Sequence, residues 1–124
     1  MKNYITDVLH RLSRHWQTIK IRMDERGMSP DISQHIVDIL RTITTDGLPV
    51  GKEQAYNLGQ ILQKNKVHFS VAIGGIYHFR KVSHPFLLRE YESLEGYLAG
   101  LQHMEDIYHI MLLAISEGYQ ESQT

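Results

Sequence analysis

The sequence predicts a mainly α-helical domain, a compact bundle of four or five helices with a long C-terminal helix. Two observations support this fold class. Apolar residues recur at helical spacing along most of the 124 residues, and helix start and stop signals separate these stretches. The length suits a single globular domain, which we expect over residues 1–118, followed by a frayed tail at 119–124. A small β-hairpin at about 67–82 is the one alternative to helix in this fold.

Residues 4–24 are predicted to form the first helix, which is amphipathic and ends at Gly27. Its apolar face consists of Ile5, Val8, Leu9, Leu12, Trp16, Ile19 and Met23. Arg11, Arg14 and Arg22 lie on another face, about 100° away around the helix. This helix therefore has one side for the core and a basic side for solvent.

The second and third helices are marked by their ends. Residues 29–31 place Ser at the cap, Pro at the first helical position and Asp in the first turn, which is a typical helix start. The helix is expected to stop at 44–47. A short loop with Pro and Gly follows at 48–51. A third helix is then predicted at about 52–64.

Residues 67–82 fit two structures. Apolar and polar residues alternate up to Gly74 and Gly75, which is the pattern of two strands joined by a tight turn. A helix capped by Ser70 also fits, although each glycine would destabilise it by about 1 kcal/mol. The hairpin would be the wing of a winged-helix fold. The helix would be the recognition helix of a helix-turn-helix, positioned by 52–64.

The last helix is predicted over residues 93–117 and carries an apolar stripe widened by Tyr and Met. Two glycines four residues apart would allow another helix to approach closely. Aromatic and Met side chains are also typical of interfaces. We therefore expect this helix to form a homodimer or to dock a protein partner. The predicted interface residues are Gly96, Gly100, Met104, Tyr108 and Met111.

Basic and acidic side chains are divided along the chain. Residues 1–81 contain twelve Lys and Arg and seven acidic residues, a net charge of +5, whereas residues 82–124 contain one Arg and seven acidic residues, a net charge of −6. Basic surfaces attract phosphates through Coulomb forces and counterion release. The residues predicted to bind nucleic acid are Arg11, Arg14, Arg22, Lys64, Lys66, His78, Arg80 and Lys81.

Glu105 and His109 form the candidate chemical pair of the chain. Glu105 falls within the apolar stripe of the last helix, where a carboxylate is costly unless it is paired. His109 follows one turn later and is expected to reach it. Such a pair can serve as acid and base or help to hold a metal. Because no second pair of this kind occurs, both residues are weak metal candidates, and we predict no cofactor.

Composition excludes several classes of protein. The chain has no cysteine, which rules out disulfides, thiolate zinc sites and cysteine nucleophiles. No apolar run approaches the ~20 residues of a membrane-spanning helix. The N-terminal residues lack the apolar core of a signal peptide. We therefore expect a cytoplasmic protein without membrane contact.

Three functions follow from these patterns. The first is a small, non-enzymatic nucleic-acid-binding regulator or subunit with a basic N-terminal module and an acidic C-terminal dimerisation or docking helix. The second is a protein-binding adaptor or inhibitor that makes no contact with nucleic acid. The third is a metal- or His-dependent enzyme that uses Glu105 and His109.

Overall fold

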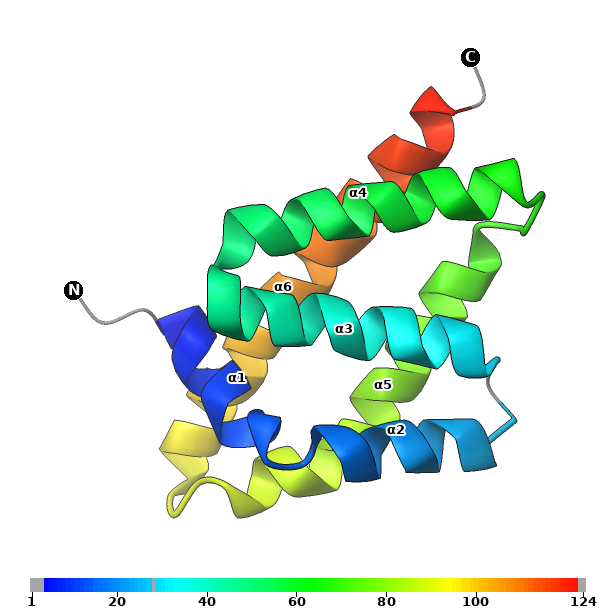
Figure 1. The fold of residues 1–124 in the computed structure, drawn as a ribbon. Coiled ribbons are helices and arrows are strands. Elements are labelled where there is room, and N and C mark those ends of the chain that lie inside the picture. Colours follow the sequence, from blue (N-terminus) through cyan, green and yellow to red (C-terminus); the bar gives the residue numbers. More distant parts are fainter. Residues whose placement is uncertain (1–3, 28, 123–124) are drawn as a thin grey trace.

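The computed structural model describes residues 4–27 and 29–122, and in this part of the chain it contains six helices and no strand (Figure 1). The helices are α1 (Tyr4–Ser13), α2 (Trp16–Glu25), α3 (Pro30–Asp46), α4 (Leu48–Lys64), α5 (Ser70–Arg89) and α6 (Leu94–Glu121). The prediction of a mainly α-helical fold with a long C-terminal helix is confirmed, but there are six helices rather than four or five. Across the described ranges, no helix combines the length and the apolar character needed to cross a membrane.

The helices pack around one core. In Figure 1, α2, α3 and α4 lie in front and roughly side by side, while α5 and α6 cross behind them. Leu9, Ile19, Ile39, Phe79 and Ile107 come from five different helices, and each is less than 2% exposed. Burial of each such side chain contributes about 1.5–3 kcal/mol, so this shared core fixes how the helices cross.

The single helix predicted at 4–24 is two helices in the structure. Helix α1 ends at Ser13, and α2 starts at Trp16. Between them, the backbone amide of His15 donates a hydrogen bond to the carbonyl of Leu12 at 2.8 Å. Of the predicted apolar face, Ile5 lies outside the side chains that the structure describes, and the other six residues are buried, among them Leu12 on α1 and Trp16 on α2. The periodicity therefore identified the buried residues correctly, but it did not reveal the change of direction between them.

Of the two alternatives for 67–82, the hairpin is wrong and the helix is confirmed from Ser70 onward, because residues 70–82 belong to α5. Buried residues along α5 recur every three or four positions, which is the helical period and not the strand period. They are Ala72, Gly75, Ile76, Phe79, Val82, Ser83, Phe86 and Leu87. At the start of the helix, the ring of His68 accepts a hydrogen bond from the backbone amide of Ser70 at 3.1 Å. Packing of a long buried face thus outweighs the local cost of two glycines.

The turn between α3 and α4 is shorter than predicted. Ser29 precedes α3 and Gly47 ends it, as the sequence indicated, but the expected loop at 48–51 is the first turn of α4. Gly47 has a φ of 99°, a conformation that glycine adopts far more readily than other residues. Gly51 then packs directly against Ile43, since a Cβ at Gly51 would overlap the Ile43 side chain.

The close helix crossing that two glycines permit occurs between α4 and α6. A Cβ at Gly59 would overlap the carbonyl oxygen of Ile115, and a Cβ at Gly118 would overlap that of Tyr56. The two backbones are therefore in direct contact. Gly96 and Gly100, which were expected to allow such an approach, lie at the other end of α6.

Candidate functional site

Two of the predicted nucleic-acid-binding arginines are bound within the protein. Arg14 lies 3.1 Å from one carboxylate oxygen of Glu90, and His15 lies 3.0 Å from the other. Arg11 donates to the backbone carbonyl of Glu90 at 2.9 Å and pairs with Asp7 at 3.2 Å. The side chain of Glu90 is only 11% exposed. This cluster, which we call the Glu90 cluster, ties α1 and the turn after it to the end of α5.

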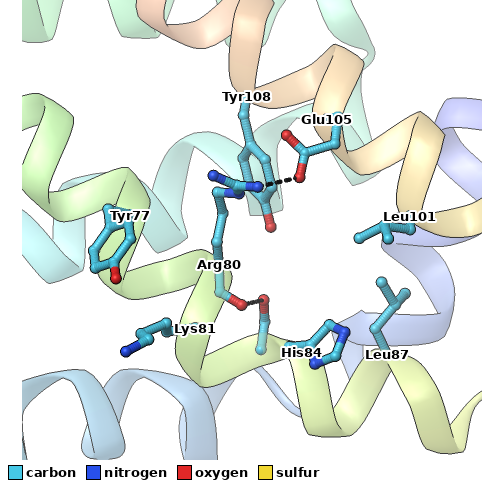
Figure 2. A pocket seen from close by; sticks show the side chains of 9 residues that line it. Tyr77, Arg80, Lys81, His84, Leu87, Leu101, Glu105 and Tyr108 are labelled. Carbon is cyan, nitrogen blue, oxygen red and sulfur yellow. Dashed lines mark hydrogen bonds and ion pairs between the residues drawn. The ribbon is translucent and has the colours of Figure 1, made fainter.

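A third predicted arginine, Arg80, is also paired. Its guanidinium lies 2.6 Å from the carboxylate of Glu105, and the pair connects α5 with α6 (Figure 2). The predicted Glu105–His109 pair is thus replaced by a pair with Arg80. His109 is exposed on α6. Because the side chain of Glu105 is 39% exposed, water also solvates its negative charge.

Four other basic side chains gather without a carboxylate partner. Three of them line a hollow between α2 and α5 that Val82 and Pro85 also line, and the fourth lies over the ring of Phe86. We call them the basic face, and they are Arg22, Arg26, Lys81 and Arg89. All four are exposed, and within residues 4–27 and 29–122 no carboxylate oxygen lies within 4.0 Å of their nitrogens. Glu25 also lines the hollow but forms no ion pair with them.

The ring of Phe86 organises the basic face. The guanidinium of Arg22 lies 4.8 Å from the ring centroid, and that of Arg89 lies 5.5 Å from it. Phe86 is itself 5% exposed and fixed by the core. Cation–π contacts of this kind hold a guanidinium in place while its N–H groups stay available to a ligand.

Sequence reasoning found two members of the basic face and missed two. Arg22 and Lys81 were predicted, although nothing placed them together. Arg26 follows Arg22 by four residues, so its position on the same face of α2 could have identified it. No sequence pattern predicts that Arg89 belongs to the basic face, because its membership depends on its contact with Phe86 in the folded protein.

The remaining predicted nucleic-acid-binding residues lie elsewhere. Lys64 ends α4 and Lys66 follows it, both exposed. His78 lies on α5, where its ring packs edge-on against Tyr77. The Nδ1 atom of His78 is buried and has no hydrogen-bond partner among the described residues. These three positions are therefore not part of the basic face.

The predicted interface residues of α6 face inward. Met104, Tyr108 and Met111 are 1%, 6% and 2% exposed and belong to the core. Gly96 and Gly100 pack against Tyr91, whose ring occupies the space that a Cβ at Gly100 would need. The guanidinium of Arg11 lies 4.6 Å from the centroid of the same ring. The small residues of α6 thus accommodate a side chain of the same molecule.

Glu105 and His109 are the two residues that the sequence offered as weak metal candidates. Over the described ranges, no three His, Cys, Asp or Glu side chains lie close enough together to hold a metal ion. The nearest charged partner of Glu105 is a guanidinium, which neutralises the carboxylate.

Comparison with protein-family models gives no match, and comparisons with curated proteins and with solved structures give none either. The chemistry of the basic face is therefore the basis on which a function can be assigned.

Proposed function

We propose that the protein is a small, non-enzymatic nucleic-acid-binding regulator that contacts phosphates through its basic face. The observation that carries this proposal is the contrast within its basic residues. Arg11, Arg14 and Arg80 have carboxylate partners, whereas the four side chains of the basic face have none among the residues that the structure describes. Unpaired cations are the ones that can exchange counterions for phosphates.

The geometry of the basic face suits phosphate recognition. Arginine presents several N–H donors in one plane and can bind two phosphate oxygens at once. Because Arg22 and Arg89 already rest on Phe86, less side-chain entropy is lost when they bind. Beside them, the ammonium of Lys81 lies 5.7 Å from the centroid of the half-exposed ring of Tyr77. An exposed tyrosine ring next to cations can stack on a base of a single strand.

Fluorescence anisotropy with labelled duplex DNA and single-stranded RNA at low salt tests the proposal. The double variant Arg22→Glu/Lys81→Glu should bind at least about tenfold more weakly, because two phosphate contacts become repulsive. The control is Arg41→Glu/Lys52→Glu, which makes the same charge change at exposed positions on α3 and α4. The control should keep most of the affinity, and both variants should keep the helical circular dichroism of the wild type.

Two outcomes would contradict the proposal. Equal losses in the two double variants would mean that net charge, and not the basic face, governs binding. No binding of either nucleic acid by the wild type would remove the nucleic-acid function altogether.

A protein-binding adaptor is the second candidate, and exposed leucines favour it. Leu94 is 71% and Leu98 is 52% exposed, and they lie one turn apart at the start of α6. Apolar side chains in such positions can anchor a protein partner or a second copy. This candidate takes precedence if the wild type binds no nucleic acid, and light scattering then measures whether two copies associate.

A further inference from the structure

A pocket of about 370 Å³ lies between α5 and α6 (Figure 2). Leu87 and Leu101 form its apolar walls, and the ring of Tyr108 lines it as well. Its volume falls in the range of small-molecule sites, about 300–1,000 Å³. Lys81 lines both this pocket and the hollow of the basic face, but the other lining residues differ.

Hydrogen-bond donors converge on the pocket from both helices. The hydroxyl of Tyr108 points toward the space between Arg80 and the two leucines (Figure 2). Burial raises the pKa of Tyr108 well above its usual value, so the hydroxyl stays protonated and can donate a hydrogen bond. From α5, Ser83 adds a hydroxyl that is 3% exposed at the residue level and now donates to the carbonyl of Arg80 at 3.3 Å.

The charges around the pocket favour one negative charge on the ligand. Arg80 and Lys81 are cations, and Glu105 is the only lining carboxylate, which leaves a net charge of +1 with His84 neutral. Glu105 already holds one edge of the Arg80 guanidinium at 2.6 Å. A monoanion would balance the remaining charge, whereas the second charge of a phosphate monoester would face the carboxylate of Glu105. The leucine walls, in turn, require an apolar ligand body.

We propose that this pocket binds an amphipathic monocarboxylate, with its carboxylate toward Arg80, Lys81 and Tyr108 and its hydrocarbon chain against Leu87 and Leu101. The site shares Lys81 with the basic face, but its other polar groups lie between α5 and α6 and not on α2. Variants of Arg80 and Glu105, which are not part of the basic face, therefore test it separately from the proposed nucleic-acid function. Arg80 and Glu105 line the pocket from α5 and α6, and the guanidinium of Arg80 would contact both Glu105 and the ligand.

Calorimetric titration of the purified protein with octanoate and octanol tests this proposal. The two probes have the same hydrocarbon chain and differ in the charged head. Octanoate should bind at least about tenfold more tightly, because only the carboxylate accepts charge-assisted hydrogen bonds. Equal affinities, or no binding of octanoate at millimolar concentration, would overturn the proposal.

Charge variants locate the carboxylate. Arg80→Gln should weaken octanoate binding about tenfold and leave octanol binding unchanged. Because Arg80 is half-exposed, this variant is compatible with folding. Glu105→Gln should tighten octanoate binding, because it frees the guanidinium of Arg80 and raises the net positive charge of the pocket. The control Arg41→Gln, on α3, should behave as the wild type. Octanoate affinities that respond equally to Arg80→Gln and Arg41→Gln would place the ligand elsewhere and refute the assignment.

A filled pocket tests the position of the hydrocarbon chain. Leu101→Trp should abolish binding of both probes, while Leu113→Trp, at an exposed position on the same helix, should not change it. Unchanged octanoate binding in a folded Leu101→Trp variant would exclude this pocket. If Leu101→Trp does not fold, the Arg80 and Glu105 variants still decide the proposal.

Discussion

The Glu90 cluster and the basic face contain the same kinds of side chain in opposite electrostatic settings. In the Glu90 cluster, the side chain of Glu90 is 11% exposed and its carboxylate pairs with Arg14 and His15. The backbone carbonyl of Glu90 accepts a hydrogen bond from Arg11. On the basic face, Arg22 and Arg89 rest on the ring of Phe86 with no carboxylate in reach. The two regions adjoin in the sequence, because Arg89 of the basic face directly precedes Glu90.

The difference shows that the partner of an arginine, and not its place in a charge run, decides what it does. Cations held by a nearly buried carboxylate connect parts of the fold, and their removal leaves an unsatisfied charge. Cations over an aromatic ring keep their donors available to an outside ligand. The two regions should therefore respond oppositely to substitution, one in stability and the other in binding.

Removal of the central carboxylate should give the largest stability effect. Glu90→Ala leaves Arg14 and His15 without their acceptor and should lower the free energy of unfolding by about 1–3 kcal/mol. Urea denaturation measures this loss. Glu92→Ala, which removes an exposed carboxylate two residues later, should change the stability little. Equal losses from the two variants would show that the cluster does not stabilise the fold.

The Glu90→Ala variant also tests, in the nucleic-acid binding assay, whether the two regions have separate roles. It removes a negative charge and leaves the basic face intact, so nucleic-acid affinity should not fall while the protein is folded. A tenfold loss of affinity in the folded variant would mean that the Glu90 cluster itself belongs to the binding surface.

A smaller effect is expected at Asp24, which lies on α2 between two residues of the basic face but does not neutralise them. Its carboxylate accepts hydrogen bonds from Lys20 at 2.8 Å and Ser33 at 2.6 Å, and these bonds hold its pKa below the usual 3.8. A lowered pKa in the folded state means that the carboxylate adds stability above pH 3.8 and loses this contribution as the pH falls through the lowered value. Asp24→Asn should therefore lower the melting temperature at neutral pH, by less than Glu90→Ala does.

Thermal unfolding of wild type and Asp24→Asn over a pH series checks this sign. The two melting curves should converge as the pH drops well below 3.8. A difference that is constant across the series would show that ionisation of Asp24 does not contribute.

The sequence predicted those parts of the fold whose signals are local. Ser29 and Pro30 started α3 and Gly47 ended it, because caps and positive-φ positions depend on neighbouring residues. The segment 67–82 left a hairpin and a helix open, since Gly74 and Gly75 are typical of a hairpin turn, whereas the buried face that favours the helix extends along α5 to Leu87. The break between α1 and α2 also depends on contacts with distant residues, including that of His15 with Glu90.

The candidate site was less predictable than the fold. Glu90 lies 75 residues after His15, so neither the distribution of charge along the chain nor helical spacing could predict that these two residues form an ion pair. Arg22 and Lys81 come together only where α2 meets α5. Sequence patterns identified which side chains are basic, whereas the three-dimensional arrangement determines which of them remain unpaired.

The salt dependence of nucleic-acid affinity tests the role of the basic face most directly. A plot of log affinity against log salt for the wild type on duplex DNA should have a slope between about −2 and −4, because each phosphate contacted contributes about −0.9. Arg22→Glu/Lys81→Glu should flatten this slope by about 2, while Arg41→Glu/Lys52→Glu should leave it unchanged. A wild-type slope near zero, or an unchanged slope in Arg22→Glu/Lys81→Glu, would contradict phosphate binding by the basic face.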